Sequence, residues 1–138
     1  MSIKRLYDGD ALCAIHVTND EWKDGLNFFS QDADFIQAGT WQYPQGKELA
    51  THQHLPAERI AGWTQEVVYV KSGRLKATVY GLQQQKLGEF EASPGDILIM
   101  LQGGHGYSIL EDGTQILEVK NGPYPGAERD RFRFGTKK

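Results

Sequence analysis

The sequence predicts one all-β domain, a sandwich or barrel of short strands. Its 138 residues are enough for a single domain with its own core, and 16 glycines separate short apolar runs of strand length. No stretch has the 3.6-residue apolar period of a long helix, although a single helical turn fits near residues 20–25. Many short strands at close spacing favour a sandwich or a barrel.

Turn signals divide the chain into ten candidate strands. These cover residues 12–17, 26–29, 35–43, 50–54, 66–71, 74–80, 86–91, 96–101, 107–110 and 114–120. The dipeptide Ser72-Gly73 lies between two apolar runs and predicts a tight β-hairpin. Glu111-Asp112-Gly113 predicts a second hairpin turn, and the alternation in residues 129–134 predicts an edge strand or a packed arm.

Composition excludes several classes of partner. Fifteen basic and eighteen acidic residues give a net charge of −3, so the basic patch needed for nucleic acid is not expected. No run approaches the roughly 20 apolar residues of a membrane helix, and the N-terminus lacks the apolar core of a signal peptide. The single cysteine, Cys13, agrees with a reducing compartment, so we expect a cytoplasmic protein. Cys13 and His16 are expected to be structural.

Three histidines and one glutamate have the character of a metal site. His52 and His54 are two residues apart, so on a strand both side chains leave the same face. Glu66 opens an apolar run, and His105 follows another apolar run across a short glycine-rich turn. Imidazole nitrogen with carboxylate oxygen suits a divalent transition metal such as Fe, Mn, Ni, Zn or Cu.

These residues resemble the motifs of the cupin superfamily. The first cupin motif is Gly-x5-His-x-His-x3,4-Glu-x6-Gly, and this chain has Gly46, His52, His54, Glu66 and Gly73 in that order. The second motif is a glycine, an apolar strand, a small turn and a histidine, which here covers residues 95–110. The resemblance covers nearly half of the chain, with the first motif at residues 46–73.

Two departures from the cupin pattern affect the ligand assignment. Eleven residues separate His54 from Glu66, so residues 55–65 are interpreted as a loop insertion. Glu58 has the usual spacing from His54 and is a rival ligand, although Glu66 starts a strand and keeps its distance to Gly73. The second motif has leucine at position 101, where proline is usual, and its histidine comes one position early.

The resemblance implies a fold and a metal site. The fold is a single cupin domain over residues 1–138, a double-stranded β-helix or jelly-roll barrel, with residues 124–138 as a C-terminal arm. The site is one divalent transition metal bound by His52, His54, Glu66 and His105. Cupins commonly pair through edge strands and arms, so a homodimer is expected through residues 2–17 or 124–134.

The resemblance also implies a range of functions. The leading expectation is a metal-dependent enzyme for a small molecule, such as a carbohydrate or sugar-nucleotide derivative, with isomerase or epimerase chemistry. The alternatives are an iron(II) dioxygenase, a metal-free isomerase that uses histidine as an acid or base, and a metal- or sugar-binding module without turnover. Small molecules, not nucleic acids or membranes, are therefore the expected ligands.

Other polar residues are candidates for catalysis. Glu118 and Lys120 alternate with Leu117 and Val119, so they leave the opposite face of their strand. They either enter a polar pocket as acid–base groups or face water as an ion pair, and Tyr107, two residues after the last candidate ligand, has the same two alternatives.

Four residues are candidates for substrate binding. Trp41 and Tyr43, near the end of one predicted strand, could line the mouth of a cavity. Arg59 and Trp63 in the inserted loop could cover the site and bind an anionic or sugar-like group, or be solvated loop residues.

Overall fold

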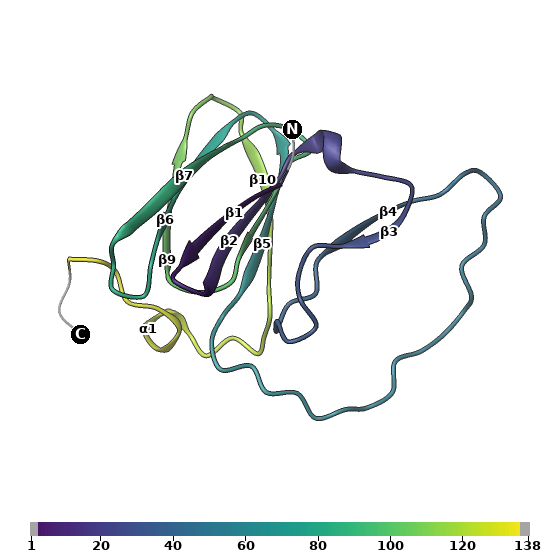
Figure 1. Ribbon diagram of the computed structural model, residues 1–138, viewed down its shortest axis with the longest axis horizontal. Coiled ribbons are helices and arrows are strands. Elements are labelled where there is room, and N and C mark those ends of the chain that lie inside the picture. The colour runs from purple at the N-terminus through teal and green to yellow at the C-terminus, as the bar shows by residue number, and fades with distance from the viewer. Residues whose placement is uncertain (1–2, 136–138) are drawn as a thin grey trace.

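The computed structural model describes residues 3–135 and is predominantly antiparallel β-structure (Figure 1). The elements are β1 (Ile3–Asp8), β2 (Ala11–Val17), the 3-10 turn η1 (Asn19–Glu21), β3 (Gly25–Phe28), β4 (Gly39–Gln42), β5 (Glu66–Ser72), β6 (Leu75–Tyr80), β7 (Lys86–Ala92), β8 (Ile97–Met100), β9 (Gly104–Ile109), β10 (Gln115–Lys120) and the short α1 (Ala127–Asp130). The all-β prediction is confirmed.

Two sheets pack face to face and form the main core. One has five strands in the order β1-β2-β8-β5-β10, and the other has three strands in the order β7-β6-β9. Alternate side chains of both sheets meet between them, since successive residues of a strand point to opposite faces. The buried residues of this core are Cys13, Ala14, Val68, Val70, Leu75, Ala77, Val79, Phe90, Ala92, Leu98 and Met100.

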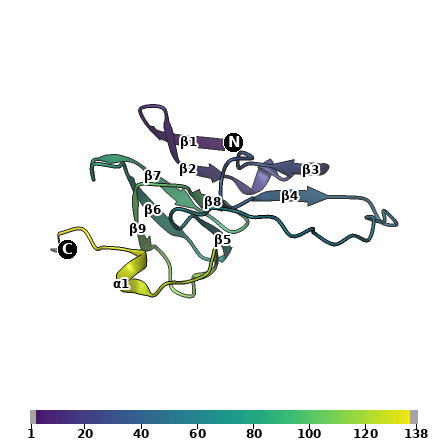
Figure 2. The same cartoon turned by 90° about the horizontal axis from the view of Figure 1, so that it is seen from below.

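A second core covers the outer face of the five-stranded sheet. Residues 29–38 cross this face over β2 and β8, where Ile36 and Ala38 pack against Ile15, Ile97 and Ile99. Both faces of β8 are therefore buried, which explains its uninterrupted apolar sequence. Figure 2 shows the strands in layers, with β1 and β2 above β6 and β9 in that view.

Neither sheet closes into a barrel within residues 3–135. Strand β9 pairs only with β6, and β10 pairs only with β5, so each has a free edge in this part of the chain. The hairpin β3–β4 forms a separate two-stranded sheet. From the end of β4 the chain runs through a long extended segment before it enters β5 (Figure 1).

The extended segment differs from the sequence prediction. Residues 44–62 are all exposed and contain no strand, so the predicted strand 50–54 is absent. That stretch has one β-branched residue, Thr51, and no apolar alternation with which to cover a core, which explains its weak preference for a sheet. The predicted strand 35–43 is also shorter, because the Gln65 side chain accepts hydrogen bonds from the backbone N–H groups of Phe35 and Ile36.

Two other differences concern connections between strands. Ser72-Gly73 does not form a hairpin, since β5 and β6 belong to different sheets and the chain turns a corner between them. Gly73 has φ +79°, and a Cβ there would lie 2.1 Å from the Thr114 hydroxyl oxygen, so only glycine fits. Residues 111–113 likewise join β9 to β10 across the two sheets. Strand β1, which was not predicted, pairs with β2 at the sheet edge.

The arms expected to join two copies lie against their own chain. The N-terminal arm forms β1 and β2 of the five-stranded sheet. The C-terminal arm contains α1, and its Phe134 ring lies 5.1 Å from the Tyr80 ring. No helix within residues 3–135 has the length and apolar character needed to cross a membrane.

Candidate functional site

The polar residues of β10 point into the sandwich. Lys120 pairs in register with Glu66 of β5, and Glu118 pairs with Val68, which is buried between the sheets. Directly opposed residues of two strands share a face, so Glu66, Glu118 and Lys120 all lie on the inner face. On this face Glu118 remains exposed and forms an ion pair with Lys120, with Nζ 3.7 Å from Oε2.

Glu66 is the centre of this group. It is 4% exposed, and its Oε1 atom accepts a hydrogen bond of 2.6 Å from the Tyr107 hydroxyl. The same oxygen lies 3.0 Å from His105 Nε2, and Lys120 Nζ lies 4.0 Å from Oε2. Tyr107 and His105 belong to β9, so the group joins the two sheets next to their free edges. A buried carboxylate with this many polar neighbours is compensated in its negative form.

The pKa values of the Glu66 and Glu118 carboxyl groups are shifted in opposite directions. Burial alone would raise the pKa of Glu66, but the hydrogen bond and positive charge of His105, with the hydrogen bond from Tyr107, lower it to about 2. Burial, with a hydrogen bond to Glu66 and its negative charge, raises the pKa of Glu118. One carboxyl group that stays ionised beside one that holds its proton more strongly is a pattern suited to acid–base chemistry.

Lys120 and Tyr107 complete the electrostatic balance. Lys120 Nζ is 3.7 Å from Glu118 Oε2, so one ammonium group serves both carboxylates. Burial and the negative charge of Glu66 raise the pKa of the Tyr107 phenol, which therefore remains a hydrogen-bond donor at neutral pH. All three residues that the sequence suggested for catalysis, Glu118, Lys120 and Tyr107, are thus brought together with Glu66.

The four predicted metal ligands fall into two separate pairs. Glu66 and His105 are in the group just described, whereas His52 and His54 lie in the exposed segment with their ring centroids 5.2 Å apart. Within residues 3–135, no cluster of three or more His, Cys, Asp or Glu side chains is arranged to hold a metal ion.

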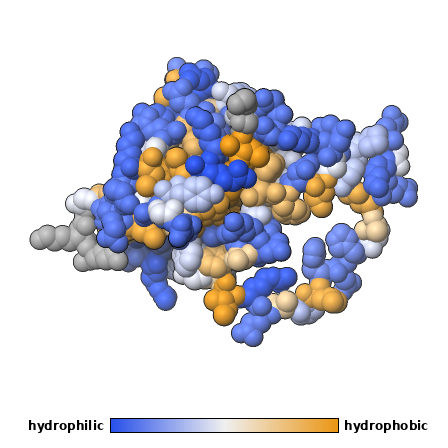
Figure 3. Space-filling model, in the orientation of Figure 1, coloured by the Kyte–Doolittle hydropathy of each residue, from blue (hydrophilic) through white to orange (hydrophobic). Residues whose placement is uncertain are grey.

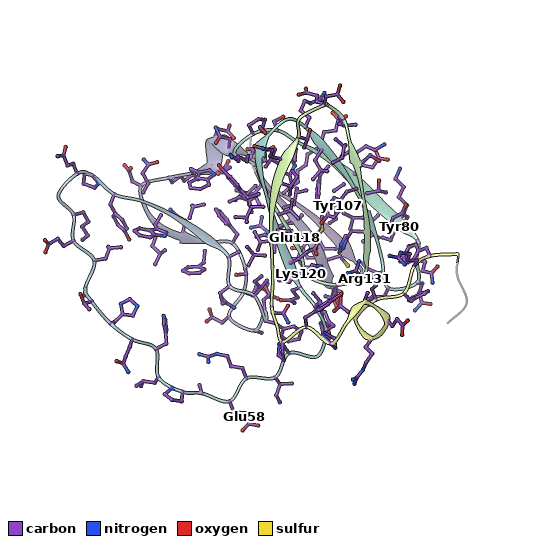
Figure 4. The ribbon with its side chains drawn as sticks, turned by 180° about the vertical axis from the view of Figure 1, so that it is seen from behind. Glu58, Tyr80, Tyr107, Glu118, Lys120 and Arg131 are labelled. Atoms are coloured by element: carbon purple, nitrogen blue, oxygen red, sulfur yellow. The ribbon has the colours of Figure 1, made fainter. Side chains whose placement is uncertain are left out.

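Glu58 and Glu66 occupy very different environments. Glu58 is exposed on the extended segment, and Figure 4 shows it far from the end of the sandwich where Tyr107, Glu118 and Lys120 lie. Glu66 is buried and touches His105. Of these two glutamates, only Glu66 therefore lies beside another predicted ligand.

The four residues suggested for substrate binding do not gather around Glu66. Trp41 is 57% exposed on the β3–β4 hairpin, with the Tyr43 ring 5.8 Å from its own, and Arg59 is exposed on the extended segment. The indole N–H of Trp63 donates a hydrogen bond of 2.7 Å to the Leu101 carbonyl. Trp63 therefore anchors the end of the segment.

Two further side chains hold the segment in place just before Glu66. The backbone N–H of Gln65 donates to Asn121 Oδ1 at 2.6 Å, and the Asn121 amide donates to the Trp63 carbonyl at 3.2 Å. Thr64 donates a hydrogen bond to Asp130 of α1. No local sequence pattern connects Asn121 with residues so distant in the chain.

Comparison with protein-family models, with curated proteins and with solved structures gives no match. What the chain does is therefore inferred from the chemistry of these side chains.

Proposed function

We propose that this chain is a cupin-type metal-binding protein and a metal-dependent enzyme that acts on a small molecule. The observation that carries the proposal is the pair of Glu66 and His105, whose Oε1 and Nε2 atoms are 3.0 Å apart. Two ligand atoms at neighbouring positions of one octahedral ion, each about 2.1 Å from it, are themselves roughly 3 Å apart. At this separation both atoms would be able to ligate one divalent ion.

The other two ligands, His52 and His54, come from the extended segment in this proposal. As placed, they do not reach Glu66, so the segment 44–62 must close against the inner end of the sandwich. Eleven residues lie between His54 and Glu66, and a stretch of this length can span roughly 40 Å when extended. The reach is therefore ample, and Trp63 to Gln65 keep one end of the segment fixed beside the site.

Exposed apolar side chains on the extended segment and on strand β9 support this closure. Leu49, Leu55 and Ile60 of the segment are 47%, 78% and 84% exposed. On β9, Ile109 is 61% exposed and the strand has a free edge in the described part of the chain. Residues 50–54 paired with this edge would cover apolar surface and complete the jelly-roll barrel.

The proposed chemistry divides the work between the metal and the chain. The bound metal supplies a Lewis acid that polarises a carbonyl or hydroxyl oxygen. In this proposal Glu118 exchanges a proton with the substrate, and Lys120, whose Nζ lies 3.7 Å from Glu118 Oε2, stabilises the carboxylate that remains. Tyr107 holds Glu66 in position. A carbohydrate or sugar-nucleotide derivative, changed by isomerisation or epimerisation, is the substrate class that the cupin resemblance favours.

Metal analysis tests the proposal. The protein is purified without added metal and titrated with Zn²⁺, alongside Glu66→Gln, the double variant His52→Ala/His54→Ala, and the matched control Glu58→Gln. We expect about one ion per chain in the wild type and in Glu58→Gln. Affinity should fall at least tenfold in the other two variants, because each loses ligands. Unchanged binding in the double variant, or loss in Glu58→Gln alone, would overturn the ligand set.

A metal-free acid–base enzyme is the second candidate. The observation in its favour is that Glu66, His105, Tyr107, Glu118 and Lys120 already contact one another without any residue of the segment. This candidate predicts no stoichiometric Zn²⁺ binding in the titration, and it places the general acid and base within that group.

A further inference from the structure

The C-terminal arm is attached to both sheets beside the Glu66 group. Next to the five-stranded sheet, Asp130 accepts a hydrogen bond from the hydroxyl of Thr64, two residues before Glu66. At the three-stranded sheet, the Phe134 ring lies against Gly104, where an added Cβ would be 2.5 Å from Phe134 Cζ. Gly104 begins β9 and immediately precedes the histidine of the group. Both attachments of the arm are therefore close in sequence to the residues of the proposed site.

The arm crosses from one sheet to the other by a short path. Four residue steps separate Asp130 from Phe134, and a stretch of this length spans at most about 14 Å. Packed sheets are about 10 Å apart, so the stretch has little slack. Residues 131–133 therefore lie across the end of the sandwich at which Glu66 and His105 meet.

The Glu66 group is accessible to solvent at this end. The side chains of His105 and Lys120 are 32% and 29% exposed, although Glu66 itself is buried. The extended segment stands clear of the body of the molecule in the space-filling view and leaves the approach open (Figure 3). A small molecule that reaches the group here lies next to the arm.

Arg131 of the arm has hydrogen-bond donors available for such a molecule. Its side chain is 46% exposed, and in the part of the chain that the structure describes its one carboxylate neighbour is Asp130, with Oδ2 4.0 Å from Nε. That separation is too long for a hydrogen bond, and the Asp130 carboxylate already accepts one from Thr64. Figure 4 shows Arg131 at the same end of the sandwich as Lys120 and Tyr107.

We propose that Arg131 binds a carboxylate group of the substrate, which is therefore a small carboxylic acid, such as a sugar acid, rather than a neutral sugar. The inference rests on the proposed function, because it takes the Glu66 group as the place where a small molecule reacts. A guanidinium has parallel N–H donors that match the two oxygens of a carboxylate. Its position on the arm makes Arg131 a residue that selects the substrate by charge.

The charges near Arg131 favour a carboxylate over a phosphate ester. Three carboxyl groups, those of Glu66, Glu118 and Asp130, lie at this end, and Lys120 is shared between two of them. Each negative charge raises the free energy of a bound anion. A phosphate monoester carries close to two negative charges at pH 7, and a carboxylate carries one. A single guanidinium therefore balances a carboxylate more completely.

NMR of the metal-free protein tests the proposal. The Nε–Hε signal of Arg131 is identified by its absence in Arg131→Gln and followed at constant ionic strength as glycolate, ethylene glycol or inorganic phosphate is added. We expect a saturable shift with glycolate, with a dissociation constant on the order of 10 mM. Ethylene glycol, which lacks the carboxylate, should give no saturation, and phosphate should bind at least about threefold more weakly than glycolate.

Backbone amide signals of residues 64–66 and 104–107 report binding in the variants. Glycolate affinity should fall at least about fivefold in Arg131→Gln, which should fold because the side chain is exposed. Arg129→Gln makes the same charge change at an exposed position of α1 and should bind like the wild type.

Three results would overturn the proposal. They are no saturation with glycolate in the wild type, glycolate binding that Arg131→Gln leaves unchanged, and phosphate binding that is tighter than that of glycolate. Because no metal is present, a failure here leaves the Zn²⁺ titration to decide the metal site separately.

Discussion

The hydroxyl of Tyr107 donates a 2.6 Å hydrogen bond to the buried carboxylate of Glu66 and so connects the two sheets. Tyr107 belongs to β9 of the three-stranded sheet, and Glu66 begins β5 of the five-stranded sheet. No pairing of strands joins the two sheets at this contact. Side-chain chemistry therefore holds together the part of the sandwich in which the proposed site lies.

Removal of the Tyr107 hydroxyl should weaken metal binding without removing a ligand. In Tyr107→Phe, the Glu66 carboxylate loses the donor that orients it, and we expect the Zn²⁺ affinity to fall about tenfold. Isothermal titration measures this, with Tyr80→Phe as the control from β6. Affinity equal to that of the wild type would show that Tyr107 has no role in placing Glu66.

Acid should destabilise the protein partly through Glu66. Its pKa of about 2 in the folded chain is below the ordinary value of 4.5, so its contribution to stability is full above pH 5 and is lost as the pH falls toward 2. This contribution is on the order of 3 kcal/mol. Urea unfolding of metal-free wild type and Glu66→Gln should give free energies that differ at pH 6 and converge near pH 2. A difference that stays constant with pH would contradict this assignment.

Asp96 should be important for stability. Its carboxylate accepts hydrogen bonds from the backbone N–H of Asn19 at 2.7 Å and of Ser93 at 3.0 Å, and it lies 2.9 Å from His16 Nε2. Both Asp96 and His16 are buried. Asp96→Ala leaves all three groups without their acceptor, so we expect a loss of about 3 kcal/mol in the free energy of unfolding. Urea titration measures it, and a loss below about 0.5 kcal/mol would be contrary to this account.

Metal should protect the extended segment from trypsin. Lys47 and Arg59 are exposed and lie in backbone without regular structure, so the metal-free protein should be cut after both. Closure over the site removes these bonds from solvent, and added Zn²⁺ should slow cleavage at least tenfold. His52→Ala/His54→Ala should show no such protection. Equal cleavage rates of the wild type with and without Zn²⁺ would mean that the segment does not close.

Most of the fold could be predicted from local patterns. Strands β5, β6, β7, β8 and β10 follow apolar or alternating runs between turn signals and lie within one or two residues of their predicted bounds. His16 and Cys13 are buried, as expected of structural residues. These features depend on residues that are close together in the sequence, so local patterns are enough to predict them.

The errors concern partners that are distant in the sequence. Ser72-Gly73 has the composition of a hairpin, but which sheet each flanking strand joins depends on β8, β9 and β10. The prediction of a strand at residues 50–54 rested on the spacing of His52 and His54, but a strand also needs a partner edge, and none pairs with this stretch in the described residues. Strand β1 was not predicted because it contains charged residues, although charged residues are common in strands at a sheet edge.

The candidate site was predicted in part. Alternation showed that Glu118 and Lys120 share a face, but only the register with Glu66 and Val68 shows that this face is the inner one. The same register exposes Leu117 and Val119 on the outside. The anchoring roles of Trp63 and Asn121 depend on contacts between distant segments, which spacing along the chain does not reveal.

The central claim is that the extended segment brings His52 and His54 to the ion held by Glu66 and His105. X-ray absorption spectroscopy of the Zn²⁺-loaded protein tests it most directly, since multiple scattering counts the imidazole ligands. Three imidazoles and one carboxylate oxygen, falling to one imidazole in His52→Ala/His54→Ala, are the expected result. A single imidazole in the wild type would contradict the claim.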